Sequence, residues 1–120
     1  MGNRATVIFH DPHQISPSVY LHWHGGAVPE LIERLAVTMQ GRYGDALYAA
    51  ARFTGQCHAL IPGNLSLGIQ NNALTQADLS SPTILAAMSP GDAGTVVVDT
   101  RDFSWRAFGG YLADYEGRPV

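Results

Sequence analysis

The chain is 120 residues long, with 46% hydrophobic residues, 14% charged residues and a formal net charge of −3. This composition excludes an intrinsically disordered protein, and the length predicts a single domain over residues 1–120 with one hydrophobic core. All seven basic residues are arginines without a basic run, and no apolar stretch approaches the ~20 residues of a membrane span, so neither a nucleic-acid polymer nor a membrane is an expected partner.

The N-terminal part predicts a hairpin of two strands. Residues 5–10 are dominated by β-branched and aromatic side chains, which favours a strand. Residues 10–18 contain two prolines and predict a loop, and residues 19–24 predict a second strand that pairs with the first. Alternation along this second strand directs one set of side chains into the interior: Val19, Leu21 and Trp23. The other set points outward: Tyr20, His22 and His24.

Two helices are predicted in the middle of the chain. Pro29 suits the first turn of a helix, apolar residues at helical spacing continue to Met39, and Gly41 supplies the stop. A second helix is expected over residues 44–60. Its apolar side is predicted to hold Leu47, Ala50, Ala51, Thr54, Cys57 and Ile61. Another side of the same helix holds Tyr48, Arg52 and Gln56, which are four residues apart.

The C-terminal half predicts three more strands. Residues 65–70 alternate as a third strand, and residues 95–99 and 104–108 are expected to form a terminal hairpin. Between them, residues 71–94 are irregular with a short helix at 82–88. The order β-β-α-α-β-β-β predicts an α+β fold, an antiparallel sheet of about five strands with two main helices packed on one face. The other face is expected to stay open to a ligand, a partner protein or a second copy.

The His22-Trp23-His24 segment is the first candidate site. Two imidazoles on one face of a strand can share a metal ion, and His10, Asp11 and His13 across the hairpin could complete the ligand set. The alternative is that these histidines lie at the surface and form hydrogen bonds or stack on their neighbours, because no His-x-x-x-His or Cys-x-x-Cys pattern is present.

Gly25 and Gly26 precede the first predicted helix. Backbone amides at such a position can bind an anion, but the sequence lacks the lysine of a P-loop, and Glu30 and Glu33 would repel an anion there. A strand-to-helix turn is therefore the preferred interpretation.

Tyr48 and Arg52 form another candidate site, on the second helix. An arginine beside a tyrosine can grip a phosphate or stack on a base. The alternative is that Arg52 covers apolar surface or pairs with a carboxylate such as Asp45.

Cys57 is the only cysteine, so it cannot form a disulfide within the chain. It falls on the apolar side of the second helix, and His58 points about 100° away from it, which is poor geometry for a nucleophile and its base. We therefore predict that Cys57 is a core residue and not a catalytic nucleophile. A single cysteine also favours a cytoplasmic protein.

Two sequence motifs carry a family resemblance. Gly2-Asn3-Arg4-Ala5 opens the first strand, and Val19 to Gly26 reads Val-Tyr-Leu-His-Trp-His-Gly-Gly. The pattern resembles a family of small uncharacterised phage and prophage proteins that begin with Gly-Asn-Arg-Ala and carry Val-Tyr-Leu-His-Trp-x-Gly-Gly. Members often have another residue at the position of His24. A weaker likeness continues through Ala51-Arg52. The matching positions are therefore His22, Trp23, Gly25, Gly26 and Arg52.

The resemblance does not supply a known enzymatic activity for this chain. It implies a phage accessory role in the cytoplasm of a bacterial host, counteracting host defence by binding a defence protein or by sequestering a small nucleotide signal. The leading hypothesis is a non-enzymatic binding protein without a cofactor, acting through the face of Tyr20 and His22 together with Arg52. Self-association into a homo-oligomer is a further expectation.

Two alternatives come from other classes of protein. One is a metal-dependent hydrolase that uses four histidines: His10, His13, His22 and His24. The other is a virion or assembly component, in which the open face of the sheet is the interface between copies.

Overall fold

The computed structural model describes residues 2–63 and 66–114. Five strands and three helices follow the order β1 (Ala5–His10), β2 (Ser18–Leu21), α1 (Val28–Thr38), α2 (Ala46–Leu60), β3 (Leu67–Gln70), α3 (Pro82–Ala87), β4 (Gly94–Asp99) and β5 (Ser104–Phe108). The α+β fold with two main helices is therefore confirmed. Leu65, the predicted start of the third strand, lies outside the described residues.

The five strands form one sheet in the order β3-β2-β1-β4-β5. The pairs β1–β2, β2–β3 and β4–β5 are antiparallel, whereas β1 and β4 run parallel with Ala5 opposite Gly94 and His10 opposite Asp99. The sheet is thus mixed, and the prediction of a purely antiparallel sheet is wrong for its central pair. The reason is burial: β1 and β4 are the strands that are buried over five of their six residues, and strands covered on both faces favour the centre of a sheet.

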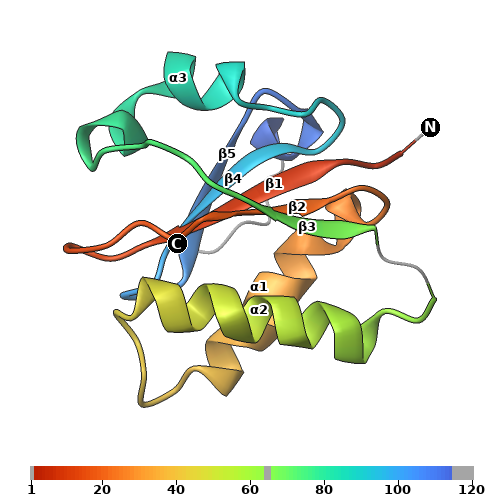
Figure 1. Ribbon diagram of the computed structural model, residues 1–120, viewed down its shortest axis with the longest axis vertical. Coiled ribbons are helices and arrows are strands. Elements are labelled where there is room, and N and C mark those ends of the chain that lie inside the picture. Colours follow the sequence, from red (N-terminus) through yellow and green to blue (C-terminus); the bar gives the residue numbers. More distant parts are fainter. Residues whose placement is uncertain (1, 64–65, 115–120) are drawn as a thin grey trace.

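Helices α1 and α2 cover one face of the sheet, and α3 lies on the other side (Figure 1). The main core lies under α1 and α2, where the rings of Phe9 on β1 and Phe53 on α2 are 5.3 Å apart between centroids. The buried stripe predicted for the first helix is confirmed. The stripe predicted for the second helix is partly wrong, because Leu47 is 45% exposed and Phe53 is buried instead.

Asp11 connects the end of β1 to the start of α2. Its Oδ2 accepts a hydrogen bond from the backbone N–H of Ala46 at 2.8 Å, and its Oδ1 accepts from the N–H groups of His13 and Gln14 at 2.8 and 2.9 Å. Burial acts to raise the pKa of this carboxyl, but the three donors outweigh it and hold the pKa below its ordinary value. Asp11 therefore stays ionised and fixes the loop against the helix.

The register assigns each strand residue to one of the two faces. Val7 pairs with Val19 and both belong to the main core, so Thr6 and its partner Tyr20 point to the opposite face. We call the side under α1 and α2 the first face and the side that carries Tyr20 the second face.

The second face is partly covered rather than open. Leu79, Leu85 and Val97 form a small core of their own between the sheet and residues 77–87. This cover is anchored at its start, where the Asn72 side-chain amide donates to the Ser16 carbonyl at 3.1 Å. The expectation of an open face is therefore corrected: the chain between β3 and β4 folds back over it because it carries enough apolar side chains to do so. None of the helices in the described part of the chain combines the length and apolar character that a bilayer crossing requires.

Candidate functional site

Tyr20 and His22 come together at the end of β2. The Tyr20 side chain lies on the second face, and the strand ends one residue before His22. The Tyr20 hydroxyl is 2.8 Å from His22 Nδ1, and both side chains are half-buried. When the neutral imidazole carries its proton on Nε2, the hydroxyl donates to Nδ1 and Nε2–H is a donor for another group. The contact therefore fixes the orientation of an imidazole just beyond the end of β2.

The Gly2-Asn3-Arg4 segment runs beside this imidazole. The Asn3 N–H donates to the His22 carbonyl at 2.7 Å, and the Gly25 N–H donates to the Asn3 carbonyl at 2.7 Å. A Cβ atom on Gly2 would lie 2.6 Å from the His22 carbonyl oxygen and 3.0 Å from His22 Nε2. Glycine is thus required where the N-terminal segment crosses the ring. The two motifs of the sequence are in direct contact.

Arg4 and Asp92 complete the cluster with an ion pair. The backbone N–H and the Nε of Arg4 both donate to Asp92 Oδ2, at 3.0 and 2.9 Å. The hydrogen bonds from the Arg4 side chain and backbone hold the pKa of Asp92 below its ordinary value, and the nearby His22 acts in the same direction. A cavity of about 380 Å³ is lined by Gly2, Arg4, His22 and Asp92. It offers a guanidinium, a carboxylate and an imidazole to one ligand.

Trp23 lies beside this cluster and faces outward. Its ring centroid is 4.6 Å from that of His22 with an interplanar angle of 82°, and the residue is 46% exposed. The prediction that Trp23 anchors the interior is wrong. Because β2 ends at Leu21, the alternation that would bury the indole does not continue.

His24, Gly25 and Gly26 form the turn into α1. The His24 carbonyl accepts from Ala27 N–H, and Gly25–Ala27 form a 3₁₀ turn. The Gly25 amide already donates to the Asn3 carbonyl, so it is not available to an anion. This agrees with the interpretation of Gly25 and Gly26 as a strand-to-helix turn. A Cβ atom on Gly25 would lie 2.6 Å from the Asn3 carbonyl oxygen.

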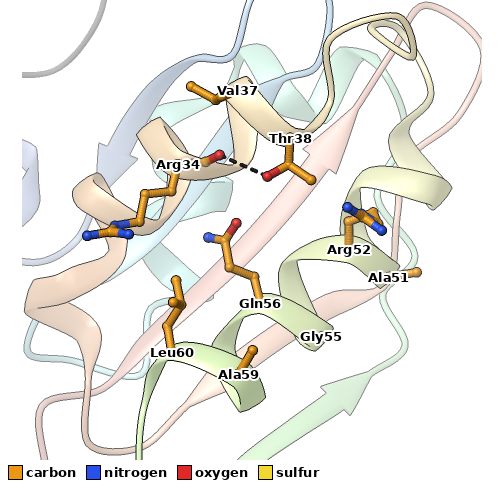
Figure 2. Close-up of a pocket in the computed structure, with 9 residues that line it drawn as sticks. All are labelled: Arg34, Val37, Thr38, Ala51, Arg52, Gly55, Gln56, Ala59 and Leu60. Atoms are coloured by element: carbon orange, nitrogen blue, oxygen red, sulfur yellow. Dashed lines mark hydrogen bonds between the residues drawn. The ribbon is translucent and has the colours of Figure 1, made fainter.

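Arg52 and Tyr48 lie on α2, away from His22. Arg52 is exposed and lines a groove of about 630 Å³ between α1 and α2, together with Arg34, Gln56 and Leu60 (Figure 2). The Tyr48 ring has the Arg42 guanidinium 3.9 Å from its centroid and that of Arg52 at 6.0 Å. Since α2 covers the first face and Tyr20 lies on the second, the structure does not join Arg52 and His22 into one surface. The partner of Asp45 is Arg42, not Arg52.

The four histidines of the metal hypothesis are not brought together. Ala5 pairs with Leu21 in the antiparallel hairpin, so His22 lies near the start of β1 and His10 at its end. Five residues of strand correspond to ~17 Å. Across residues 2–63 and 66–114, no group of three or more His, Cys, Asp or Glu side chains is placed to hold a metal ion.

Arg4 and Asp92 were missed by reasoning from sequence. Arg4 belongs to the N-terminal motif, and that membership was the one available signal. Asp92 lies 88 residues away in sequence from its partner, in a segment without a motif. It enters the site through the pairing of β1 and β4, which sets Ala5 opposite Gly94.

Comparisons of the chain with protein-family models, with curated proteins and with solved structures gave no match. The resemblance to small phage and prophage proteins therefore stays a prediction.

Proposed function

We propose that this protein is a non-enzymatic binding protein that captures a small, planar, polar ligand, such as the base of a nucleotide, in the cavity beside His22. One observation carries the proposal: an imidazole oriented by Tyr20 at 2.8 Å lines a cavity with an Arg4–Asp92 pair and touches an exposed indole. This combination of a polar cavity and an adjacent aromatic platform suits a heteroaromatic ring.

The chemistry of the lining matches the edge of a nucleobase. Both Arg4 bonds end on Asp92 Oδ2, so Oδ1 is not used by Arg4 and can accept from a ligand amine or amide N–H. His22 Nε2 supplies a donor in the tautomer described above. Trp23 offers its exposed face for stacking, which contributes about 1–3 kcal/mol per base.

Binding is favoured over catalysis by what lines the cavity. Gly2, Arg4, His22 and Asp92 supply no hydroxyl or thiol nucleophile. The Cys57 thiol lies in the main core, where burial raises its pKa to about 12. The separation of the four histidines gives no support to the hydrolase hypothesis. Residues 77–87 cover part of the sheet face that the assembly hypothesis requires to be open.

The biological role rests on the family resemblance. We infer a phage or prophage accessory protein in the cytoplasm of a bacterial host, which counteracts host defence by sequestering a nucleotide signal. The proposal also includes capture of a defence protein through the cluster around His22. It further includes self-association of the protein.

Two measurements test this function. Mass spectrometry of small molecules released on denaturation would identify a ligand carried through purification, and calorimetric titration with ribonucleoside monophosphates and cyclic dinucleotides would measure binding.

Trp23→Ala is expected to weaken binding of the best probe by about 5- to 150-fold, the equivalent of one stacking contact. Leu47→Ala is the matched control, because Leu47 is exposed to a similar degree on α2. Equal losses in both variants, or no binding of any probe, would refute the proposal.

A further inference from the structure

A second cavity lies at the opposite end of β1 from His22. It has a volume of about 400 Å³ and is bounded on one side by the sheet and on the other by residues 76–80. His10 and Asp99, the last residues of the parallel strands β1 and β4, are paired in register at its edge. The carboxyl ends of neighbouring parallel strands are a common place for ligand sites in open sheets.

The arginines of this cavity differ in their pairing. Arg101 holds Asp99 through two hydrogen bonds, Nε to Oδ1 at 3.1 Å and Nη2 to Oδ2 at 2.7 Å, which neutralises that carboxylate. Arg106 has no ion pair with any residue that the structure describes. Its hydrogen bond is a long one, from Nη2 to the Leu79 carbonyl at 3.5 Å, and its guanidinium lies 5.2 Å from the Phe108 ring. The Arg106 guanidinium is therefore weakly hydrogen-bonded, and it lines the cavity.

His10 adds a neutral donor to the same wall. It is half-buried, and burial is the main cause that lowers its pKa, which Asp99 and Asp11 raise and Arg101 and Arg106 lower further. The Thr100 N–H and hydroxyl both donate to the His10 carbonyl, at 3.0 and 2.9 Å. Two donors on one carbonyl hold the end of β1 in place, so the imidazole is carried by a fixed backbone.

We propose that this cavity binds the phosphate group of a small phosphomonoester, with Arg106 as the forked donor and His10 as a second donor. Its charged side chains, Arg101, Arg106 and Asp99, leave a net positive charge in a protein whose net charge is −3. Guanidinium groups bind phosphate oxygens through two parallel N–H bonds, and Arg106 is the arginine here that is not committed to a carboxylate. The volume of about 400 Å³ fits a ligand of the size of a phosphorylated sugar.

The site is separate from the one proposed for the base-like ligand. His10 and His22 lie at opposite ends of β1, ~17 Å of strand apart. Each site can therefore be tested without disturbing the other.

The experiment uses the full chain and two probes, inorganic phosphate and ribose 5-phosphate, with acetate as a comparison anion. Affinity is measured by calorimetry, and the site is located in the wild-type protein by backbone amide shifts in NMR spectra. We expect saturable binding of both phosphates, weaker binding of acetate, and shifts concentrated at residues 10, 76–80 and 97–106. Arg106→Gln should weaken phosphate binding at least ~10-fold, because it removes a charge-assisted pair of bonds.

Arg34→Gln is the matched control, since it removes an exposed arginine on α1 and should leave the affinity unchanged. Arg106→Lys keeps the charge without the fork and should retain an intermediate affinity. The proposal is overturned if the wild-type protein does not bind either phosphate saturably, if Arg106→Gln binds as tightly as the wild type, or if the shifts centre on His22. If Arg106→Gln does not fold, the comparison of Arg106→Lys with Arg34→Gln and the wild-type shifts decide the question.

Discussion

The Tyr20 hydroxyl lies 2.8 Å from Nδ1 of His22, across the end of strand β2. Tyr20 is placed by the sheet, and His22 is the first residue beyond the strand. Because Nδ1 is engaged by the hydroxyl, Nε2 is the ring nitrogen left to face a ligand. The orientation of this ring is the physical basis of the proposed binding function.

Tyr20→Phe removes the hydroxyl and keeps the ring. We expect ligand binding to weaken about 2- to 13-fold, the equivalent of one hydrogen bond of ordinary strength, while the thermal unfolding temperature changes little. Calorimetric titration with the best nucleotide probe provides the measurement. Tyr43→Phe is the control, because the Tyr43 hydroxyl also makes one hydrogen bond, to the Ala36 carbonyl at 3.0 Å, on the side of the helices. Unchanged binding in Tyr20→Phe would show that the hydroxyl does not orient His22.

Gly25→Ala tests the contact between the two sequence motifs. The new methyl group would meet the Asn3 carbonyl oxygen at 2.6 Å and the Ala93 Cβ at 2.8 Å, so we expect destabilisation by about 1–3 kcal/mol in urea unfolding. Gly55→Ala is the opposite case. Gly55 is in the interior of α2 with nothing within 4 Å of its would-be Cβ, and alanine there should stabilise the protein by about 0.5–1 kcal/mol. The same sign for both variants would contradict this account.

Asp11→Asn tests the link between β1 and α2. An amide places an NH₂ group against backbone N–H donors, so we expect a loss of about 1–3 kcal/mol at neutral pH. The pKa of Asp11 is lowered in the folded state. The stability that its carboxylate contributes is therefore present above the unfolded pKa of about 3.9 and is lost as the pH falls through the folded pKa.

The difference between wild type and Asp11→Asn should therefore narrow in urea unfolding below about pH 4. Asp102→Asn, at an exposed turn, should change stability little at either pH. A difference that does not depend on pH would mean that the ionised carboxylate is not what stabilises the link.

Cys57 is expected to be inert in the folded protein. Burial raises its pKa to about 12, and the thiolate is the reactive form, so iodoacetamide should not label the native protein at neutral pH. Labelling should be rapid in concentrated guanidinium. Rapid labelling of the native protein would place the thiol at the surface and contradict the packing of α2.

The elements of the fold are largely readable from local patterns. The apolar spacing up to Met39 and the positive φ of +91° at Gly41 agree with the predicted end of α1. The direction of β4 was not readable in this way, although the run Thr95 to Val98 is nearly continuous in apolar and β-branched residues, as strands buried on both faces are. That run was the available signal for a central, parallel strand.

Only part of the candidate site could be predicted from the sequence. Tyr20 and His22 share a side as alternation requires, but the strand stops at Leu21, where the chain turns to let Gly25 approach Asn3. Such a stop depends on a contact with a distant segment. The same is true of the pair between Arg4 and Asp92, which forms only after the sheet has assembled.

In the proposed complex the ligand binds against the His22 imidazole. The most direct measurement is a calorimetric titration of His22→Ala and wild type with the nucleotide probe that binds best, after circular dichroism has shown that the variant is folded. We predict an affinity at least ~10-fold lower in His22→Ala, since the ring supplies both a hydrogen bond and one wall of the cavity. Equal affinity in the two proteins would exclude the cavity beside His22 as the binding site.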